Sequence, residues 1–517
     1  MGKLISRFTP LYFLFLVVHM CALSAESTAT SADSNDKKGT EDKKATEVPP
    51  LTKKEITTTH SVKINNIDIS YTATIGTQPI LDEKGKPKAN FVYIAYTKNN
   101  TDQLQDRPIA FCFNGGPGSS SVWLHLGTLG PKRIEFDSEG LHPKQPSRLI
   151  DNSHSLLDVA DLVFLDPVST GYTRAENSDD AKQYHGVDGD IQSVAEFIRL
   201  YVTRNQRWGS PKFLIGESYG TVRAVGVAEE LHDKKYLYLN GLILISSVLN
   251  YETLMFDSGN DLPYILFLPS YTVAALYHNK LEDSLKHDPE KTIREAKEFA
   301  YGEYAKALLK GSLLDKDERQ AVVDKMSKYT GLSQQFVDSA NLRVNGWRFA
   351  KELLKSEKKT IGRFDSRFVG PNLDQWNSTD YDPSFENVLG VFTSSLNQYL
   401  QSDLQWDSQE EYKILTDVSP WDYDSKNQYL DMTENLRHTM IKNPKLQVFV
   451  VNGINDLALP FVLQEYTFAH LNLPPELRQN VAVKTYEGGH MMYLKQPTLG
   501  KMKEDMAKFI EQSSPHR

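Results

Sequence analysis

The segment 216–220, which reads Gly-Glu-Ser-Tyr-Gly, constrains the fold of this chain more than any other feature. It follows an apolar run at 213–215 and precedes a stretch of helical periodicity that begins at Thr221. A strand, a tight turn and a helix in this order lift a serine hydroxyl above the edge of a sheet, because the two glycines leave room for a strained turn. Ser218 is therefore a candidate nucleophile. The alternative is an ordinary serine in a strand-to-helix turn.

Short apolar runs bounded by turn residues recur on both sides of this segment. They lie at 67–73, 91–96, 109–113, 162–165, 213–215, 242–245, 448–451 and 481–483. Runs of this length suit strands that are buried on both faces. Helical patterns at 190–203 and 221–232 lie between some of them. Strands that alternate with helices predict an α/β domain around a mainly parallel sheet.

The segment 251–440 interrupts the run of strands. It shows helical periodicity at 292–309, 318–329 and 341–354, and it has few strand signals. We therefore expect a helical cap inserted over one end of the sheet. This insertion would divide the core of the domain into a first part at 59–250 and a second part at 441–517.

The first residues predict export. Two basic residues precede an apolar run at 11–23 and then small residues, which is typical of a secretory signal peptide at 1–25. The run is short for a hydrocarbon layer of about 30 Å, although an uncleaved anchor is the alternative. Residues 26–58 are rich in Ser, Thr, Lys, Glu and Asp, so we expect a disordered linker there. These features favour a secreted or periplasmic protein.

Composition excludes several functions. The formal charge is −9, from 67 acidic and 58 basic residues, whereas proteins that bind nucleic acid usually carry a basic excess. Hydrophobic residues make up 40% of the chain, which is ordinary for a globular protein. The two cysteines, Cys21 and Cys112, form no Cys-x-x-Cys motif or Cys/His cluster, so we expect no thiolate metal site and no disulfide framework.

Two downstream residues complete a candidate catalytic triad. In α/β-hydrolase folds the chain order is serine, then acid, then histidine. Asp456 follows the apolar run 448–451, and His490 follows two glycines just after the run 481–483. His490 would act as general base and then general acid, and Asp456 would fix its tautomer. Alone, Asp456 is more often a loop or capping residue and His490 a hydrogen-bonded structural residue, but their order and placement favour catalysis.

A glycine-rich segment after the run 109–113 is a candidate oxyanion loop. Residues 114–121 read Asn-Gly-Gly-Pro-Gly-Ser-Ser-Ser, and paired glycines let backbone N–H groups approach a ligand closely. In α/β-hydrolases one oxyanion donor comes from such a loop and the other from the residue after the nucleophile, here Gly116 and Tyr219. A purely structural glycine turn is the alternative. No Gly-Lys-Ser/Thr follows, so this is not a phosphate loop.

Taken together, these motifs resemble the serine carboxypeptidase family, and in particular its disulfide-free bacterial members. The blocks that carry the resemblance are 114–121, 164–172, 216–219 (Gly-Glu-Ser-Tyr) and 489–491 (Gly-His-Met). The resemblance covers roughly residues 60–510. It implies an α/β-hydrolase fold with a helical insertion, no metal or other cofactor, and release of C-terminal residues from peptides.

The resemblance also implies that Asn114 and Glu217 bind the substrate carboxylate. Two carboxylates in contact repel each other unless they share a proton, so one of them must have a raised pKa. We therefore expect peptide binding to weaken from about pH 5 toward neutral pH.

Three departures from the family pattern bear on function. Cys112 stands where the family has a tryptophan, Ser119 where it has a cysteine and Thr128 where it has a glutamate. The tryptophan and the glutamate belong to the family's carboxylate-binding network. The alternative function is therefore an esterase or acyltransferase that uses the same triad on small esters. A binding module without catalysis is a third hypothesis.

Other residues are expected to be structural. We expect Cys112 to be a buried small hydrophobic residue, Arg223 to form a structural ion pair, and His125 to be structural. We expect three tyrosines after Pro263 to lie mostly in the core, with some possible in the pocket: Tyr264, Tyr271 and Tyr277.

Overall fold

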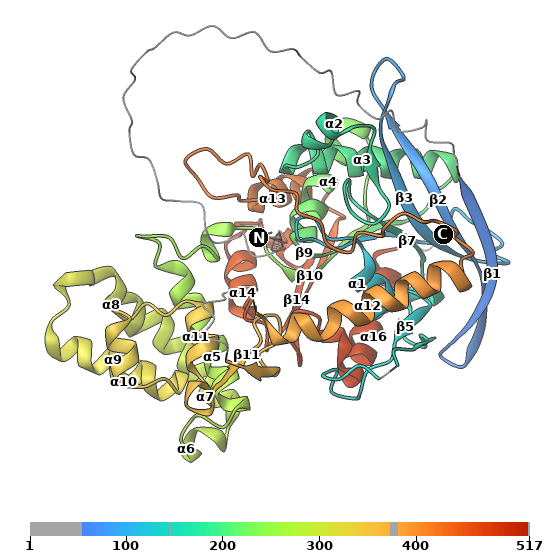
Figure 1. The fold of residues 1–517 in the computed structure, drawn as a ribbon. Helices are drawn as coiled ribbons and strands as arrows, with labels where there is room; N and C mark the ends of the chain where they lie inside the picture. Colours follow the sequence, from blue (N-terminus) through green and yellow to red (C-terminus); the bar gives the residue numbers. More distant parts are fainter. Residues whose placement is uncertain (1–53, 145, 373–380, 515–517) are drawn as a thin grey trace, which may run out of the picture.

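The computed structural model describes residues 54–144, 146–372 and 381–514 (Figure 1). A 10-stranded sheet has the strand order β1-β2-β3-β7-β4-β9-β10-β13-β14, with β8 paired to β3. Its strands are β1 (Glu55–Ile64), β2 (Ile67–Leu81), β3 (Pro87–Lys98), β4 (Ile109–Phe113), β7 (Asp161–Leu165), β8 (Arg174–Ala175), β9 (Lys212–Ser218), β10 (Gly241–Ser247), β13 (Gln447–Gly453) and β14 (Val481–Tyr486). Two small two-stranded sheets pair β5 (Lys132–Ile134) with β6 (Leu149–Asp151) and β11 (Lys359–Ile361) with β12 (Val369–Pro371).

The sheet is parallel from β7 to β14, as the alternation of strands and helices predicts. The strands β1, β2, β3 and β7 pair antiparallel and extend it on one side. Residues 55–58 belong to β1 and pair with β2, so the expected linker boundary at 58 is wrong. β1 alternates exposed residues with half-buried ones and, near its end, with the buried Val62 and Ile64, and it contains three consecutive threonines, so it lacks the apolar run of a strand buried on both faces.

Helices cover both faces of the sheet, and others lie beside it. They are α1 (Val122–Leu124), α2 (Ser178–Lys182), α3 (Val187–Arg204), α4 (Tyr219–Lys235), α5 (Leu262–Tyr277), α6 (Asp283–Lys286), α7 (Pro289–Phe299), α8 (Ala305–Lys310), α9 (Lys316–Thr330), α10 (Gln334–Ser339), α11 (Gly346–Glu352), α12 (Pro383–Ser402), α13 (Thr433–Lys442), α14 (Phe461–Ala469), α15 (Pro475–Arg478) and α16 (Gln496–Ser513). α3, α4 and α13 pack on one face, and α1, α12 and α16 pack on the other.

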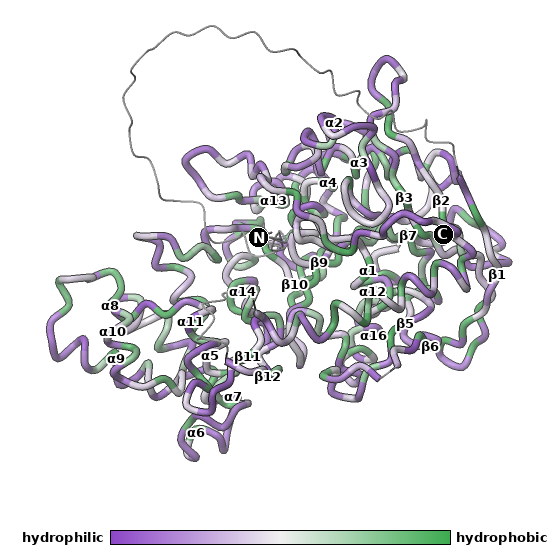
Figure 2. The backbone as a smooth tube through the Cα atoms, viewed as in Figure 1, coloured by the Kyte–Doolittle hydropathy of each residue, from purple (hydrophilic) through white to green (hydrophobic). Residues whose placement is uncertain are grey.

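The central strands contribute side chains to two separate hydrophobic cores, because successive side chains of a strand point to opposite faces of the sheet. In β4, Ala110 and Cys112 join the core under α12 and α16, whereas Phe111 and Phe113 join the core under α3 and α4. Figure 2 shows hydrophobic stretches along β9 and β10, and hydrophilic ones along the outer helices α2 and α6. Every residue of β4 is buried, which explains its unbroken apolar run.

Helices α5 to α11, together with the β11–β12 hairpin that follows them, form a lobe beside the sheet (Figure 1). They share a third core of their own, to which Phe267, Tyr271 and Phe349 contribute. Tyr271 is buried there, and its hydroxyl donates to the Val344 carbonyl at 3.0 Å, whereas Tyr277 is 47% exposed and lies outside the core.

The range 251–440 that we expected for the cap is longer than this lobe. α12 packs through Val388, Phe392 and Leu396 against the main sheet core, and α13 packs through Leu436 and Met440 against the opposite face. Both helices are amphipathic, so their sequences do not show which core their apolar face joins. The chain thus leaves the sheet, builds the lobe and returns to cover both faces before β13.

Candidate active site

Ser218 lies at the sharp turn between β9 and α4, with φ of 60° and ψ of −131°. L-residues rarely adopt this conformation, and strain of this kind is common at functional sites. There is no room for side chains on the flanking glycines: a Cβ on Gly216 would overlap the Gly220 carbonyl, and a Cβ on Gly220 would lie 2.9 Å from the Phe113 oxygen. The turn places Ser218 at the carboxyl edge of the sheet, where it lines a cavity.

His490 and Asp456 follow the neighbouring strands β14 and β13. Asp456 is fully buried and its Oδ2 lies 2.7 Å from His490 Nδ1. Its Oδ1 accepts the N–H groups of Ala458 and Leu459 at 2.7 and 2.9 Å, which fixes the carboxylate. Burial alone would lower the pKa of His490, but the charge and hydrogen bond of Asp456 raise it overall. With Nδ1 held by Asp456, Nε2 remains to take a proton from a serine hydroxyl.

The glycine-rich loop after β4 packs against the first residues of α4. A Cβ on Gly115 would lie 2.6 Å from the backbone nitrogen of Gly220 and closer still to that of Tyr219, so a side chain does not fit. Gly116 has φ of 102°, which favours glycine. Gly116 and Tyr219 line the same cavity as Ser218. Because the first N–H groups of a helix have no partner within the helix, the Tyr219 amide is suited to bind an oxyanion.

Glu217 is 2% exposed and lines the same cavity. Its Oε2 accepts hydrogen bonds from Asn114 Nδ2 and from the Tyr493 hydroxyl, each at 2.8 Å. Burial raises the pKa of Glu217 to about 7, and His490, Tyr493 and Asn114 oppose this shift only in part. The structure thus joins Glu217 to Asn114, as the sequence suggested, and adds Tyr493. Tyr493 was not predicted as a site residue, although it lies three residues after His490.

The raised pKa of Glu217 predicts a pH-dependent stability. The folded protein holds this proton up to about pH 7, whereas a glutamate at its ordinary pKa of 4.5 loses it earlier, so the stability contributed by the protonated form is full below pH 4.5 and falls as the pH rises through 7. Glu217→Gln removes the titration. We expect the variant to be more stable than the parent at pH 8 by up to about 3 kcal/mol, with a smaller difference at pH 4.5.

Urea unfolding at several pH values checks this prediction. Glu386→Gln, at an exposed position on α12, is the matched control. A stability difference for Glu217→Gln that stays constant between pH 4.5 and pH 8 would contradict the assignment.

A loop of the lobe, residues 362–368, is hydrogen-bonded to the loops that carry Asp456 and His490. Three backbone hydrogen bonds make the connection: Leu457 N–H to Arg363 C=O at 2.9 Å, Ser366 N–H to Asn455 C=O at 2.9 Å, and His490 N–H to Phe364 C=O at 2.5 Å. The Phe364 ring also packs edge-on against the His490 imidazole, with ring centroids 5.0 Å apart. The lobe therefore supports the site directly. Backbone pairing between such distant segments leaves no signal in the sequence.

A buried ion pair strengthens this connection. Asp365 pairs with Arg367 at 2.6 Å, and its Oδ2 also accepts the N–H of Gly489 at 3.1 Å. A Cβ on Gly489 would lie against the Asp365 backbone and the Phe364 oxygen, so glycine is required before His490. The loop of the lobe thus fixes the backbone of Gly489, the residue that precedes His490.

The cavity in front of Ser218 has a volume of ≈ 170 Å³ and mostly apolar walls. The sheet side contributes Glu217, Ser218 and His490, and α1 contributes Trp123. The lobe contributes Phe267, Trp347, Arg363 and Phe364. None of Tyr264, Tyr271 and Tyr277 lines this cavity.

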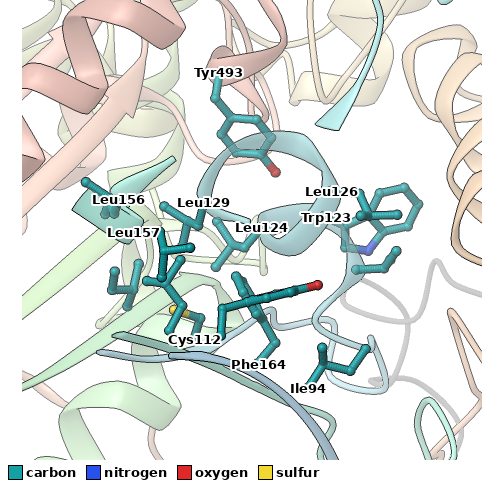
Figure 3. Close-up of a cluster of buried hydrophobic side chains, with 14 of the residues drawn as sticks. Ile94, Cys112, Trp123, Leu124, Leu126, Leu129, Leu156, Leu157, Phe164 and Tyr493 are labelled. Atoms are coloured by element: carbon teal, nitrogen blue, oxygen red, sulfur yellow. The ribbon is translucent and has the colours of Figure 1, made fainter. Parts of the chain in front are cut away.

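The departures from the family pattern lie mostly away from the cavity. Cys112 is fully buried among core side chains that include Leu129 and Phe164 (Figure 3), and burial raises the pKa of its thiol. Cys112 and Thr128 do not line the cavity. Trp123 does, and its indole N–H donates to Ser119 Oγ at 2.8 Å. A tryptophan is therefore present at the cavity, supplied from another position of the sequence.

Arg223 and His125 have the structural roles that we expected. Arg223 pairs with Asp190 at 2.8 Å, both are buried, and the guanidinium also donates to the Asn114 carbonyl at 2.5 Å. It therefore supports the loop that carries Asn114. His125 is buried and hydrogen-bonds to the Tyr96 hydroxyl at 2.6 Å, and burial lowers the pKa of His125 to about 3.

These observations define the class of the protein. The sheet is parallel at its centre, with a serine on the turn after β9, an acid after β13 and a histidine after β14. This is the arrangement of an α/β-hydrolase.

The chain belongs to the serine carboxypeptidase family, whose model matches residues 81–504. The pheromone-processing carboxypeptidase KEX1 of Saccharomyces cerevisiae is 30% identical over 145 residues, which cover 27% of this chain and only 19% of that protein. Serine carboxypeptidase 24 of Arabidopsis thaliana is 22% identical over 397 residues, which cover 74% of each chain. The family that the sequence motifs resemble is thus confirmed.

A solved structure supports the fold class. The crystal structure of a prohormone-processing carboxypeptidase from Saccharomyces cerevisiae, KEX1(delta)p, has a TM-score of 0.55 and 15% sequence identity, and the match covers 86% of this chain and 92% of that one. This likeness confirms the expected α/β-hydrolase fold.

The expected N-terminal signal peptide and linker lie mostly before the first residue that the structure describes. The expected signal peptide at 1–25, and the linker up to residue 53, lie outside the described residues. Among the residues that the structure does describe, no helix combines the length and apolar character needed to cross a bilayer. Within the same residues, no group of three or more His, Cys, Asp or Glu side chains could hold a metal ion.

Proposed function

We propose that this protein is a serine-type carboxypeptidase that releases C-terminal residues from peptides. The observation that carries the proposal is the buried Glu217, which lines the cavity beside Ser218 with Asn114 and Tyr493 bonded to it. Hydrolysis of an ester or an internal amide needs no such group. A carboxyl that stays protonated up to about pH 7 can donate a hydrogen bond to a substrate carboxylate.

The proposed reaction follows the triad chemistry. His490 Nε2 takes the Ser218 proton while Oγ attacks the carbonyl carbon of the last peptide bond, and the backbone N–H groups of Gly116 and Tyr219 stabilise the oxyanion. The imidazolium then gives its proton to the leaving nitrogen, which departs as the free C-terminal amino acid. Water, deprotonated by His490, attacks the acyl-enzyme and releases the shortened peptide. Asp456 holds the imidazole in orientation and stabilises its positive charge.

Two ionisations set the expected pH profile. Above about pH 7 Glu217 loses its proton and repels a terminal carboxylate, so KM for a free-acid peptide should rise. At low pH His490 is protonated and cannot act as the base, so kcat should fall; its raised pKa moves this limb to higher pH. Because the first limb lies at about pH 7 and the second above the ordinary histidine value of 6.5, the two effects leave a narrow optimum close to neutral pH.

A matched pair of blocked peptides, one a free acid and the other its C-terminal amide, tests the function at about pH 5 and about pH 7.5. We expect preference for the free acid at the lower pH, a loss of that preference at the higher pH, and no turnover by Ser218→Ala. Equal cleavage of acid and amide, or turnover of simple esters alone, would favour the esterase or acyltransferase alternative. Failure of Ser218 to react with an organophosphonate would favour a binding module.

We further propose a secreted or periplasmic location and a peptide or small ester as substrate. The support is the basic and apolar start of the sequence, followed by small residues. Determination of the mature N-terminus after expression in a host with a secretory pathway tests the location. A mature chain that begins near residue 26 supports export, and an intact chain retained in the cytoplasm contradicts it.

A further inference from the structure

Tyr493 reaches the site from the segment that follows the catalytic histidine. It belongs to the short helical turn η8 (Met492–Leu494) after the loop of His490, and it is fully buried. Its hydroxyl donates to Glu217 Oε2 at 2.8 Å, so this side chain links the histidine loop to the end of β9. Tyr493 is therefore placed to act on substrate binding through Glu217.

The ring of Tyr493 packs on a helical turn that has no side chain at the point of contact. This turn is η1 (His125–Leu129), and a Cβ on its Gly127 would lie 2.6 Å from Cε2 of the tyrosine ring. Figure 3 shows the ring beside the helical segment that carries Leu126 and Leu129. Glycine at position 127 thus makes room for the tyrosine.

The next residue on this turn, Thr128, is one of the departures from the family pattern. It stands where the family has a glutamate of the carboxylate-binding network. Thr128 is 1% exposed, and its hydroxyl has no hydrogen-bond partner among the described residues, so it does not replace that glutamate. The turn instead supports the ring of Tyr493, whose neutral phenol reaches Glu217.

Two donors fix one oxygen of Glu217. Asn114 Oδ1 accepts the N–H of Leu124 at 3.1 Å, so Asn114 Nδ2 faces Glu217, to whose Oε2 it donates at 2.8 Å. The Tyr493 hydroxyl donates to the same oxygen, and because burial raises the pKa of Tyr493, the phenol keeps its proton. A proton on Oε1 of Glu217 leaves both hydrogen bonds intact. Oε1 is therefore the oxygen left to donate to a ligand in the cavity that Glu217 lines.

The titratable and charged groups around Glu217 oppose one another. Burial has the largest effect and raises the pKa of Glu217, and four neighbours modify the shift: His490, Tyr493 and Asn114 lower the pKa, and Asp456 raises it. Arg363 of the lobe lines the same cavity. The hydrogen bond from Tyr493 favours the ionised carboxylate, because an anion is the stronger acceptor. Loss of this donor should therefore let Glu217 keep its proton to a higher pH.

We propose that Tyr493 is a positioning residue for peptide recognition, which takes the place of the family's glutamate beside Glu217. It holds Oε2, leaves Oε1 for the C-terminal carboxylate of the substrate, and limits the pH range over which that carboxylate is bound. Because the phenol stays neutral, recognition depends on the ionisation of Glu217 alone and not on a proton shared by two acids. This inference rests on the proposed carboxypeptidase function.

The pH dependence of KM in Tyr493→Phe tests the proposal. We expect the rise in KM for a free-acid peptide to move upward by about one pH unit, because a hydrogen bond stabilises a carboxylate more than the neutral acid. KM at about pH 8 should then be about fivefold lower than in the parent, and KM at about pH 5 should differ by less than about threefold. kcat, which depends on His490, should change little. A packing defect cannot improve binding at the higher pH.

Tyr304→Phe is the matched control. Tyr304 is also buried, and its hydroxyl donates to the Leu342 carbonyl at 2.7 Å, but it belongs to the core of the lobe. This variant loses a buried hydrogen bond and should keep the pH profile of the parent. In Glu217→Gln, which has no carboxyl to titrate, the addition of Tyr493→Phe should no longer change the pH dependence of KM.

Two results would overturn the proposal. One is a KM for Tyr493→Phe that rises equally at both pH values, which is the mark of a packing defect, and the other is an unmoved profile. Replacement of Tyr493 by 3-fluorotyrosine gives a second test that nearly keeps the shape of the side chain. Its more acidic phenol is a stronger donor, so the rise in KM should move to lower pH. A shift to higher pH would contradict the role of the hydroxyl.

A binding measurement separates this proposal from the proposed function. In Ser218→Ala, a blocked peptide can be titrated by calorimetry without turnover, as the free acid and as the amide, at about pH 5 and about pH 8. We expect a preference for the free acid that extends to higher pH when Tyr493→Phe is added. Equal binding of acid and amide at both pH values would contradict the proposed function and this inference with it. A preference for the acid that Tyr493→Phe leaves unmoved would contradict the role of Tyr493 alone.

Discussion

Replacement of Asp456 by asparagine is expected to lower kcat by about 10⁴-fold, because the amide no longer holds the imidazole in the tautomer that the serine needs. In the structure Asp456 Oδ1 is occupied by two backbone N–H groups, and Oδ2 faces His490 Nδ1 at 2.7 Å. An asparagine that keeps its carbonyl oxygen on the backbone groups must point its NH₂ at Nδ1. Nδ1 then accepts a hydrogen bond, and Nε2 carries the proton and cannot act as base.

Single-turnover kinetics with a free-acid peptide measure this effect, because they isolate acylation from product release. KM should change little, since Asp456 does not contact the substrate in the proposed reaction. The size and shape of Asp456→Asn match the parent, so circular dichroism should be unaltered. Asp324→Asn, at an exposed position on α9, is the control and should keep full activity. A loss below about tenfold in Asp456→Asn would mean that another group orients His490.

The sequence predicted the parts of the site that depend on local chain geometry. Ser218 ends the buried strand β9, Asp456 follows the buried strand β13 and His490 follows β14, a mostly exposed strand at the edge of the sheet. Parallel strands bring their carboxyl ends to one edge of a sheet. Order along the chain was therefore enough to place the three side chains together. Asn114 was implied by the resemblance to the family and Gly116 by the usual role of such a glycine-rich loop, and the structure brings both near the nucleophile because β4 and β9 are neighbours in the sheet.

The parts that the sequence did not reveal depend on long-range packing. The loop 362–368 contacts Asn455, Leu457 and His490 mainly through backbone atoms, which any sequence supplies. Trp123 lies on a short helix after the glycine-rich loop, and its approach to the cavity depends on how that loop turns. Arg363 was not considered as a site residue, because nothing in the sequence connects the lobe to one wall of the cavity.

Substitution of Gly115 by alanine is expected to lower kcat by about 10²- to 10³-fold, which is the usual effect of losing one oxyanion donor. The backbone of Gly115 adopts a conformation open to any residue, so the variant is not strained by its φ angle. Its Cβ would instead lie 2.6 Å from the Gly220 nitrogen and closer to that of Tyr219. These atoms belong to the first turn of α4 and cannot move without shifting Ser218. The loop must therefore retreat, and the Gly116 amide moves away from the oxyanion.

Gly390→Ala is the matched control for this change, because Gly390 lies on α12 with nothing within 4 Å of an added Cβ. It should keep full activity. The decisive comparison uses a boronic acid, which forms a tetrahedral adduct with the serine, and a neutral product analogue, which does not. Gly115→Ala should weaken the boronic acid by the same factor as kcat and leave the product analogue nearly unchanged, because only the adduct carries the oxyanion. Equal weakening of both compounds would show that the loop serves substrate binding and that the Gly116 amide is not an oxyanion donor.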